Sequence, residues 1–395
     1  MLPSGNEGKV YIMSETTQAT VLKFLHCGDI HLDTPFTGLS PEKSDERRLG
    51  LRDSFRQMME YVRGAGINYV LISGDLFESD CATSNTADLL ISEFRSSPNT
   101  KFIIAPGKHD HYNNNLIYST NRLPSNCYIF SSEKMDRFDF AKDNVVIYGW
   151  AFMEDSIIAT PFDGRAVDDS SKINIVCGYA DLDGPVGSTI CPVSTADIKS
   201  FGADYYAFGS RHEGSELGKF GKSMFGYSGA IESTGFDEPG IGGAKLITVK
   251  YKDGNMDMAV KNLSFGKIVF KKEIVDITGV DTASEVVNRV SGLITDRKYG
   301  PETALYLEFV GDIDPRFIIP KNIGSDVFEL YYFETKDKTM PLYNTDSFRR
   351  DMSVKGELYR QLLPMLHSRD EEERLLAARA FREGLAALEN REIDT

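Results

Sequence analysis

Near the start of the chain, short apolar runs alternate with stretches in which apolar residues recur every three or four positions. The runs at 21–25, 69–73 and 101–105 predict strands, because they are short and rich in valine, isoleucine, leucine and phenylalanine. Residues 44–64 and 86–94 have the spacing of amphipathic helices. Strands and helices that alternate in this order are typical of an α/β fold with parallel strands.

Further apolar runs follow, but short turn-rich links replace the helices between them. These runs cover residues 144–150, 173–177, 205–208 and 245–249. Strands joined by short links predict a second sheet packed on the first. The expected core is therefore a two-sheet sandwich flanked by helices.

Beyond residue 265 the pattern changes to that of a small α+β domain followed by helices. Strands are predicted at 268–277, 304–310 and 327–335, and helices at 282–294, 354–365 and 370–389. The predicted domains are a flexible leader at 1–20, a core at 21–265, an α+β domain at 266–345 and a helical extension at 346–395. The expected fold class is mixed α/β.

Composition narrows the classes of function only slightly. The 395 residues are 41% hydrophobic and 26% charged, as in ordinary globular proteins. No apolar run approaches the roughly 20 residues of a membrane span, so no membrane association is expected. A net charge of −15 argues against a wholly basic nucleic-acid binder, although a local basic patch beside a metal site is compatible with a nuclease. The five cysteines are far apart and include no CxxC pair, which predicts a reducing, cytoplasmic location.

Four short segments carry the residue types that bind divalent metal ions. They are Gly28-Asp29-Ile30-His31, Gly74-Asp75-Leu76-Phe77-Glu78, Gly107-Lys108-His109-Asp110 and Gly209-Ser210-Arg211-His212. The first three follow predicted strands, and side chains just past strand ends meet at the carboxyl edge of a sheet. Aspartate and histidine are ligands for hard and borderline divalent ions. The sequence therefore predicts a metal site built from these segments.

These segments resemble the calcineurin-like metallophosphoesterases, and more narrowly the bacterial SbcD/YhaO-type DNA-repair exonucleases. The resemblance rests on FLHCGDIHLDTPF, VLISGDLFES and GFDEPGIGGAKLITV, and is strongest over residues 21–249. It implies a two-sheet phosphoesterase core with two manganese ions, a small cap domain beside the active-site cleft (here 266–345), and C-terminal helices that dock an SMC-like ATPase. DNA ends or single strands would be the substrate, and pairing of two copies of the chain is left open.

The resemblance also implies which residues hold the first ion. In the family these are a D-x-H pair, the Asp of a GD segment and the last His of a G-H-x-H segment. The matching residues are Asp29, His31, Asp75 and His212, and all four are present. One ion is therefore expected here, with manganese as the family's metal and Fe²⁺ or Zn²⁺ as alternatives. A second ion is not expected, because its own ligand positions are substituted.

The positions that match the second ion's own ligands are substituted. Where the family has an asparagine and two histidines, this chain has Lys108, Tyr179 and Ser210. A protonated lysine cannot bind a metal, but it can neutralise a phosphate oxygen as a point charge. We expect the Lys108 ammonium to lie near Asp75 at the second position, because opposite charges pair favourably in a partly dry cleft.

His109 and Asp110 match the family's general acid and the carboxylate that orients it. A histidine held by a carboxylate suits proton donation to a leaving alkoxide. The alternative is a structural histidine, hydrogen-bonded within its loop. Glu78 and Asp33 lie close to the predicted ligands in sequence, and each either orients a ligand or is a solvated carboxylate.

Three functions are compatible with these features. The first is a metal-dependent phosphodiesterase that acts as a DNA exonuclease with weakened activity. The second is a catalytically decayed nuclease that keeps DNA or ATPase binding. The third is a small-molecule phosphoesterase, which the predicted cap domain and helical tail argue against. The substituted second-ion positions favour the binding module, whereas the intact first-ion residues favour the enzyme.

The C-terminal helices have two interpretations. Leu375, Phe381, Leu385 and Leu388 form an apolar stripe at helical spacing. The stripe either packs on the protein's own core or is covered by a partner such as an SMC-like ATPase. We expect it to be exposed in the isolated chain, as a contiguous patch that a partner would bury.

Overall fold

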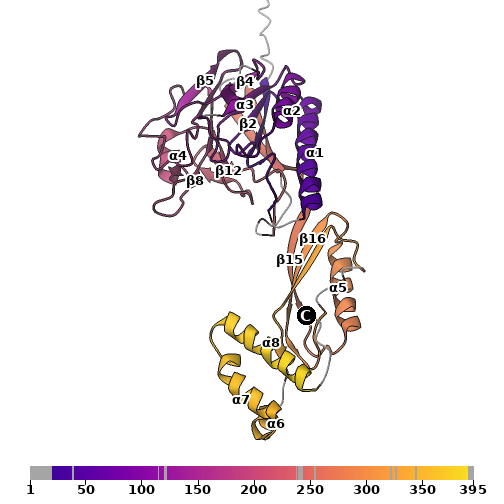
Figure 1. The fold of residues 1–395 in the computed structure, drawn as a ribbon. Helices are drawn as coiled ribbons and strands as arrows, with labels where there is room; N and C mark the ends of the chain where they lie inside the picture. The colour runs from indigo at the N-terminus through magenta and orange to yellow at the C-terminus, as the bar shows by residue number, and fades with distance from the viewer. Residues whose placement is uncertain are drawn as a thin grey trace, which may run out of the picture. The chain divides into compact units, whose positions relative to one another are not determined.

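The computed structural model describes residues 20–37, 40–113, 115–119, 122–236, 238, 243–252, 255–320, 323–324, 327–342 and 345–389. The chain divides into two compact units (Figure 1). The first contains the residues up to Ile231 together with Gly243–Phe265, and the second contains Glu232–Gly242 and the residues from Gly266 onward. All of the predicted leader except Thr20 lies outside the described residues. The finer division at residue 345 stays a prediction.

The first sheet of the first unit has six strands in the order β14-β13-β1-β2-β3-β4. They are β14 (Asn255–Ser264), β13 (Gly243–Lys252), β1 (Thr20–Cys27), β2 (Tyr69–Ile72), β3 (Lys101–Ile104) and β4 (Cys127–Ile129). The four strands from β1 to β4 are parallel to one another. Strand β13 pairs antiparallel with β1, and β14 pairs antiparallel with β13. The three predicted strands before residue 110 are confirmed.

Two helices cover one face of this sheet, α1 (Pro41–Ala65) and α2 (Ser84–Arg95). Helix α1 begins where the Ser40 side chain accepts a hydrogen bond from the Lys43 amide, and it ends at Gly66 in the left-handed conformation, with φ 64°. Its buried apolar residues recur at helical spacing and pack on the sheet. Both predicted helices are confirmed.

The second sheet has the order β11-β12-β10-β7-β6-β5. Its strands are β11 (Gly218–Phe220), β12 (Ser223–Tyr227), β10 (Tyr205–Gly209), β7 (Ile173–Tyr179), β6 (Val145–Gly149) and β5 (Asp136–Phe140). Helix α4 (Thr195–Phe201) packs on its outer face. Smaller elements are α3 (Leu116–Ser119), the 3₁₀ turn Ala141–Asp143, and the pair β8 (Asp181–Leu182) and β9 (Pro192–Val193).

A buried apolar layer lies between the two sheets. It includes Phe24 and Leu71 from the first sheet and Ile147, Ile175 and Tyr205 from the second, all of them buried. Strands that are apolar on both faces are expected where a sheet is covered on both sides. The α/β fold class and the two-sheet sandwich are thus confirmed.

The second unit contains an all-parallel sheet of β15 (Val269–Asp276), β16 (Thr303–Val310) and β18 (Tyr332–Asp337), with helix α5 (Ala283–Arg297) packed on it. A short parallel pair, β17 (Asp312–Ile313) and β19 (Met340–Pro341), is formed by residues that follow β16 and β18 in the chain. The predicted strand at 327–335 starts too early. Phe328 and Leu330 pack against the core from a turn, so their apolar character does not mark a strand.

The chain continues into helices α6 (Thr345–Arg350), α7 (Val354–Leu366) and α8 (Glu371–Leu388). The Lys355–Glu389 ion pair joins the start of α7 to the end of α8, so these two helices run antiparallel. The expectation that the apolar stripe is exposed is wrong for Phe381 and Leu385. These side chains are 0% and 2% exposed, because α7 covers them. Only Leu388 of the four stripe residues is exposed, at 41%, and Leu375 is half-buried.

No helix in the described part of the chain is both long enough and apolar enough to cross a membrane.

Candidate metal centre

The candidate ligands lie in loops that follow β1, β2 and β10. Hydrogen bonds from the amides of Asp29 and His31 to the carbonyls of Gly74 and Asp75, at 3.0 and 2.9 Å, hold the first two loops together. Asp29, His31 and Asp75 have φ of 49°, 50° and 52°, a left-handed conformation that is uncommon for residues other than glycine. Backbone strain of this kind is concentrated at functional sites.

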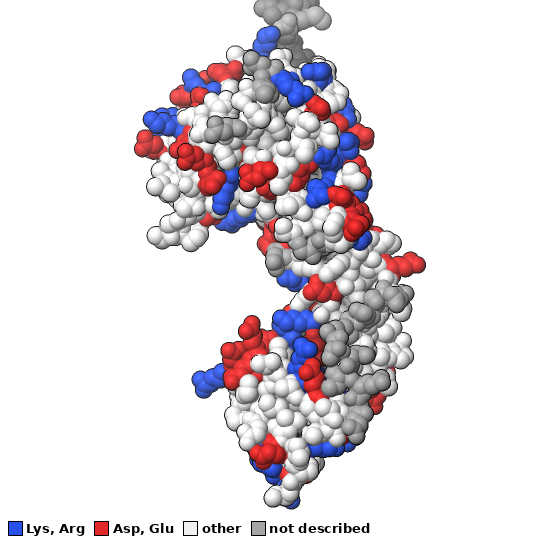
Figure 2. Space-filling model, in the orientation of Figure 1, with Lys and Arg blue, Asp and Glu red and all other residues white. Residues whose placement is uncertain are grey.

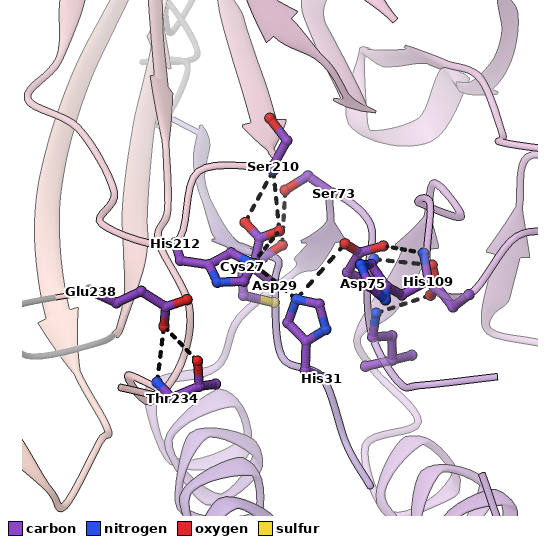
Figure 3. A network of polar contacts seen from close by, with 12 residues as sticks. Cys27, Asp29, His31, Ser73, Asp75, His109, Ser210, His212, Thr234 and Glu238 are labelled. Atoms are coloured by element: carbon purple, nitrogen blue, oxygen red, sulfur yellow. Dashed lines mark hydrogen bonds and ion pairs between the residues drawn. The ribbon is translucent and has the colours of Figure 1, made fainter. Parts of the chain in front are cut away.

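The four residues predicted to hold the first ion converge in the structure. His31 Nε2 lies 3.0 Å from His212 Nε2 and 3.8 Å from Asp75 Oδ2. His212 Nε2 lies 3.9 Å from Asp29 Oδ1. Figure 3 shows His31 between the two carboxylates, with His212 beside Asp29. Residues that are 181 positions apart in sequence thus present their ligand atoms to one small region.

These atoms fit a divalent cation. Asp75 Oδ2 is buried and has no hydrogen-bond partner among the described residues, so it is an acceptor that a cation would satisfy. Two imidazole nitrogens that bind one ion at about 2.1 Å lie roughly 3.0 Å apart when they meet at a right angle. The two Nε2 atoms have this separation, at 3.0 Å. The predicted ligand set is therefore brought together in a form that suits one ion.

The charges of the site act strongly on each other. Burial, and after it the neighbouring Asp75 carboxylate, raises the pKa of Asp29 to about 6. Burial alone would lower the pKa of His31, but the hydrogen bond with Glu78 and the nearby carboxylates raise it overall. Two buried carboxylates that repel each other destabilise the metal-free site, and a bound cation would relieve this repulsion.

We expect the metal-free protein to lose stability as the pH rises from about 5 to about 7. The pKa values of Asp29 and Asp110 are about 6 in the folded protein, against about 3.9 for an unfolded carboxyl. A group whose pKa is higher in the folded than in the unfolded protein stabilises the fold fully at pH values below its unfolded pKa. This stabilisation is lost as the pH rises through its folded pKa. The raised pKa values of His31 and His109 act in the same direction, whereas the lowered pKa of the buried His26 acts against it, so the net loss should be on the order of 1 kcal/mol.

Urea denaturation at the two pH values, in the presence of a chelator, measures this change. Glu78, whose pKa is lowered to about 2, stays ionised across this range and does not obscure it. The buried His26 alone would raise the free energy of unfolding by about 2 kcal/mol from pH 5 to pH 7, so a rise of that size would contradict the account.

Glu78 joins a predicted metal ligand to the predicted general acid. Its carboxylate pairs with His31 Nδ1 at 2.6 Å and with His109 Nδ1 at 2.9 Å. Burial opposes ionisation of Glu78, but the hydrogen bonds and charges of the two histidines lower its pKa to about 2. The same contact raises the pKa of His109, whose ring is 45% exposed. The carboxylate that orients His109 is therefore Glu78.

The expectation that Asp110 orients His109 is wrong. The Asp110 carboxylate accepts hydrogen bonds from the amides of Gly107, Asp75 and Leu76, at 2.6, 3.0 and 2.9 Å, and from the Tyr118 hydroxyl. It is fully buried beneath the loops, and these four donors occupy both of its oxygens. Asp110 thus holds the Asp75 and His109 loops in place and does not contact the His109 ring.

At two of the substituted second-ion positions, the side chain makes contacts within the protein. The Tyr179 ring packs on Gly74, where an added Cβ would lie 2.4 Å from the ring, and Gly74 has φ 99°. Burial, and then the charges of Asp75 and Asp29, raises the pKa of the Tyr179 hydroxyl. The Ser210 hydroxyl donates to the carbonyl of Ala180 at 2.7 Å, while its amide donates to Asp29 at 3.1 Å.

The expected pairing of Lys108 with Asp75 is wrong. In the part of the chain that the structure describes, no ion pair or hydrogen bond joins the two side chains, and Lys108 is half-exposed. The His109 amide instead donates to Asp75 Oδ1 at 2.8 Å. The loop backbone, rather than the Lys108 ammonium, thus contacts this carboxylate oxygen.

Comparison with known proteins identifies the part of the chain that carries this site. Residues 22–213 match the family model for calcineurin-like phosphoesterases. This segment is therefore similar to calcineurin-like phosphoesterases. The chain is also 25% identical over 303 residues to YhaO of Bacillus subtilis (strain 168), named as an uncharacterized metallophosphoesterase. That match covers 74% of this chain and 72% of YhaO.

Several solved structures are similar to part of the chain. A dimetal phosphatase from Danio rerio is 11% identical, with a TM-score of 0.39, over 62% of this chain and 96% of that protein. Purple acid phosphatase PPD1 from yellow lupin seeds is 12% identical, with a TM-score of 0.34, over 62% and 52%. Vacuolar Protein Sorting 29 from Cryptosporidium parvum is 15% identical, with a TM-score of 0.28, over 62% and 98%.

Glu78 has a role that the sequence left undecided, whereas His26 is packed in the core, as its position inside a predicted strand indicates. Glu78 bridges His31 and His109, and its position three residues after Asp75, in the same loop, was the available signal. His26 lies between the sheets, with Nδ1 3.0 Å from the Tyr205 hydroxyl. Burial, with a smaller effect of Lys245, lowers the pKa of His26 to about 3, so this histidine is a neutral core residue.

Proposed function

We propose that the phosphoesterase domain is a metal-dependent phosphodiesterase that acts on DNA and holds one firmly bound divalent ion. The observation that carries this proposal is the convergence of Asp29, His31 and His212, with the buried Asp75 Oδ2, which has no hydrogen-bond partner among the described residues, beside them. A bound divalent ion would polarise a phosphoryl oxygen and lower the pKa of a bound water. Manganese is the expected ion, with Fe²⁺ or Zn²⁺ as alternatives.

His109 is placed to supply the proton that the leaving oxygen needs. Glu78 holds its Nδ1, which leaves Nε2 as the nitrogen that can donate. The hydrogen bond that His109 Nδ1 donates to Glu78 raises the pKa of His109 and so keeps more of the acid form near neutral pH. Since the ring is partly exposed, it can approach a substrate without rearrangement of the core.

Two cationic side chains near the site could contact the phosphates of DNA. One is Lys108, and the other is Arg211, whose guanidinium donates to the carbonyl of Leu182 at 2.8 Å and lies 4.7 Å from the centre of the Tyr227 ring. On the face of this unit in Figure 2, basic and acidic residues are interspersed. On this face, affinity for DNA would therefore depend on a few contacts close to the metal rather than on a broad basic surface.

A second candidate function is a DNA-binding or ATPase-binding module that no longer hydrolyses its ligand. The conformations of Tyr179 and Ser210 favour it, because neither offers a ligand for a second ion. In this alternative the C-terminal helices would contact an SMC-like ATPase. The exposed side chains of α7 and α8, rather than Phe381 and Leu385, would then form the contact.

The two candidates are separated by a direct assay. Purified chain, loaded with Mn²⁺ and freed of excess metal, is tested on end-labelled single- and double-stranded DNA and on bis(p-nitrophenyl) phosphate. Mn²⁺-dependent release of nucleotides is expected, together with near one equivalent of metal by elemental analysis. His109→Ala should lower kcat by roughly 10²- to 10⁴-fold and leave metal content unchanged.

Other results have distinct meanings. Metal-dependent cleavage that survives His109→Ala at full rate would overturn the proposed role of His109. DNA binding without cleavage of either substrate would replace the enzyme by the binding module. Cleavage of the small phosphodiester without action on DNA would support the small-molecule phosphoesterase instead.

A further inference from the structure

The two ring nitrogens of His31 face two different groups of ligand atoms. Nε2 lies 3.0 Å from His212 Nε2 and belongs to the candidate metal centre. Nδ1 lies 2.6 Å from one oxygen of Glu78, and the other oxygen of Glu78 lies 2.9 Å from His109 Nδ1. His31, Glu78 and His109 thus form a second group, whose ligand atoms all lie within 4.8 Å of one another. This group uses none of the substituted second-ion positions.

Backbone hydrogen bonds hold the loops of this second group together. The Glu78 amide donates to the carbonyl of Leu32, the residue after His31, at 2.9 Å. The Ser79 amide donates to the His109 carbonyl at 3.0 Å. The rings of His31 and His109 meet edge to face, with their centres 5.0 Å apart. Three loops therefore present these ligand atoms from a fixed backbone.

A cation needs only small movements of these side chains in order to bind. A tetrahedral ion with bonds of about 2.1 Å separates its ligand atoms by roughly 3.4 Å. The contacts of 2.6 and 2.9 Å with Glu78 would therefore widen by less than about 1 Å. The His31 side chain is 5% exposed, whereas that of His109 is 45% exposed. An ion can therefore enter from solvent on the His109 side.

The donor atoms of the second group favour a borderline cation. Two imidazole nitrogens and one carboxylate, with a position left for water, are a ligand set of catalytic zinc sites. The candidate metal centre has two carboxylates beside its two histidines, and oxygen ligands suit manganese better. The two groups thus differ in the cation that they favour, although they share the His31 ring.

We propose that His31 Nδ1, Glu78 and His109 Nδ1 form a separate cation site that takes Zn²⁺ and inhibits the phosphoesterase domain. Each nitrogen releases its proton to solvent as it binds the ion, so metal bonds replace both hydrogen bonds to Glu78. When the first ion occupies Nε2, His31 becomes an imidazolate that bridges the two cations. The inhibition rests on the proposed function, in which His109 donates a proton. A neutral ring bound through Nδ1 gives up its Nε2 proton far less readily than an imidazolium does.

Zinc titration of the full chain measures the site directly. The chain is loaded with Mn²⁺ and freed of excess metal, and Zn²⁺ is added at slightly alkaline pH, where an ordinary histidine is neutral. The parent should bind about one equivalent of zinc and keep its manganese. Glu78→Gln and His109→Gln should each lower this zinc affinity by at least about tenfold. His111→Gln is the matched control, because His111 is close in sequence but outside the group.

Three results of the titration would overturn the site. They are the absence of a zinc equivalent, parent-like zinc affinity in Glu78→Gln, and zinc that enters only by displacing manganese. Retained manganese in each variant shows that its fold is intact.

Anomalous diffraction at the zinc edge locates the ion. It should lie on the Nδ1 side of His31, roughly 6 Å from the first ion, because the imidazole ring and two bonds of about 2.1 Å separate them. Zinc about 3.5–4 Å from the first ion, the spacing of ordinary two-metal sites, would overturn the proposal.

The inhibition has its own readout. Zinc should slow hydrolysis of bis(p-nitrophenyl) phosphate by the manganese-loaded parent at least about tenfold, and a weak chelator should restore the rate. An unchanged rate with zinc bound at the site would overturn the inhibitory role. Zinc bound at the site in a chain that hydrolyses neither DNA nor the small phosphodiester would support the site and overturn the proposed function.

Discussion

Replacing Asp75 by asparagine is expected to abolish tight metal binding while leaving the domain folded. Asp75 supplies a buried oxygen, Oδ2, that has no hydrogen-bond partner among the described residues, and the substitution removes its negative charge. The new amide keeps an Oδ1 acceptor for the His109 amide, which donates to Asp75 at 2.8 Å. Affinity for Mn²⁺ should fall by at least about 100-fold, since loss of residues that merely support ligands already costs 10- to 100-fold.

The same variant should be more stable than the parent when no metal is present. The Asp75 charge is the second-largest cause, after burial, of the raised pKa of Asp29, so its removal relieves a buried repulsion. Calorimetric titration with Mn²⁺ and thermal unfolding with and without the metal measure both effects. Asp45→Asn, at a mostly exposed carboxylate, is the control. Parent-like Mn²⁺ affinity in Asp75→Asn would remove Asp75 from the ligand set.

The triple substitution Lys108→Asn, Tyr179→His and Ser210→His is expected to create a second metal site. Each change installs a residue type that binds divalent ions, at a loop around Asp75. Replacing Tyr179 also removes the ring that packs on Gly74 and on Phe152, at 5.4 Å between ring centres. The variant should bind close to two equivalents of Mn²⁺ by elemental analysis and hydrolyse phosphodiesters faster than the parent.

Lys108→Asn alone is the matched control for this experiment. It should still bind one ion, because the Tyr179 ring stays in place and the Ser210 hydroxyl stays bound to the Ala180 carbonyl. Loss of the tyrosine ring should lower the free energy of unfolding of the triple variant by about 3 kcal/mol. A second equivalent of metal in the single variant would show that Tyr179 and Ser210 were wrongly assigned.

Local sequence pattern was enough to predict most strands and helices, and the family resemblance supplied the residues that meet at the metal centre. Asp29 and Asp75 follow neighbouring parallel strands of the first sheet, so their meeting follows from topology, whereas His212 follows a strand of the second sheet. Strand β14 was missed, although Met256, Met258 and Val260 alternate with polar or small residues, because its ends carry polar residues that weaken the signal.

Contacts between side chains were harder to predict than element order. Asp110 is adjacent to His109 in sequence, but the direction of its carboxylate is set by amides of two loops that the chain brings together only on folding. Glu78 was left undecided for the same reason. The apolar face of α8 was expected to be exposed in the isolated chain and is instead largely covered by α7, because sequence periodicity does not distinguish a helix of the same chain from a partner as its cover.

The origin of the ligands in both sheets has a consequence for how slowly the domain unfolds. His31 follows a strand of the first sheet and His212 a strand of the second, with 181 positions between them. An ion held by both would act as a crosslink that closes this long loop. The sheets could then separate only after the ion dissociates, so bound metal would extend the lifetime of the folded domain against proteolysis as well as shift its equilibrium.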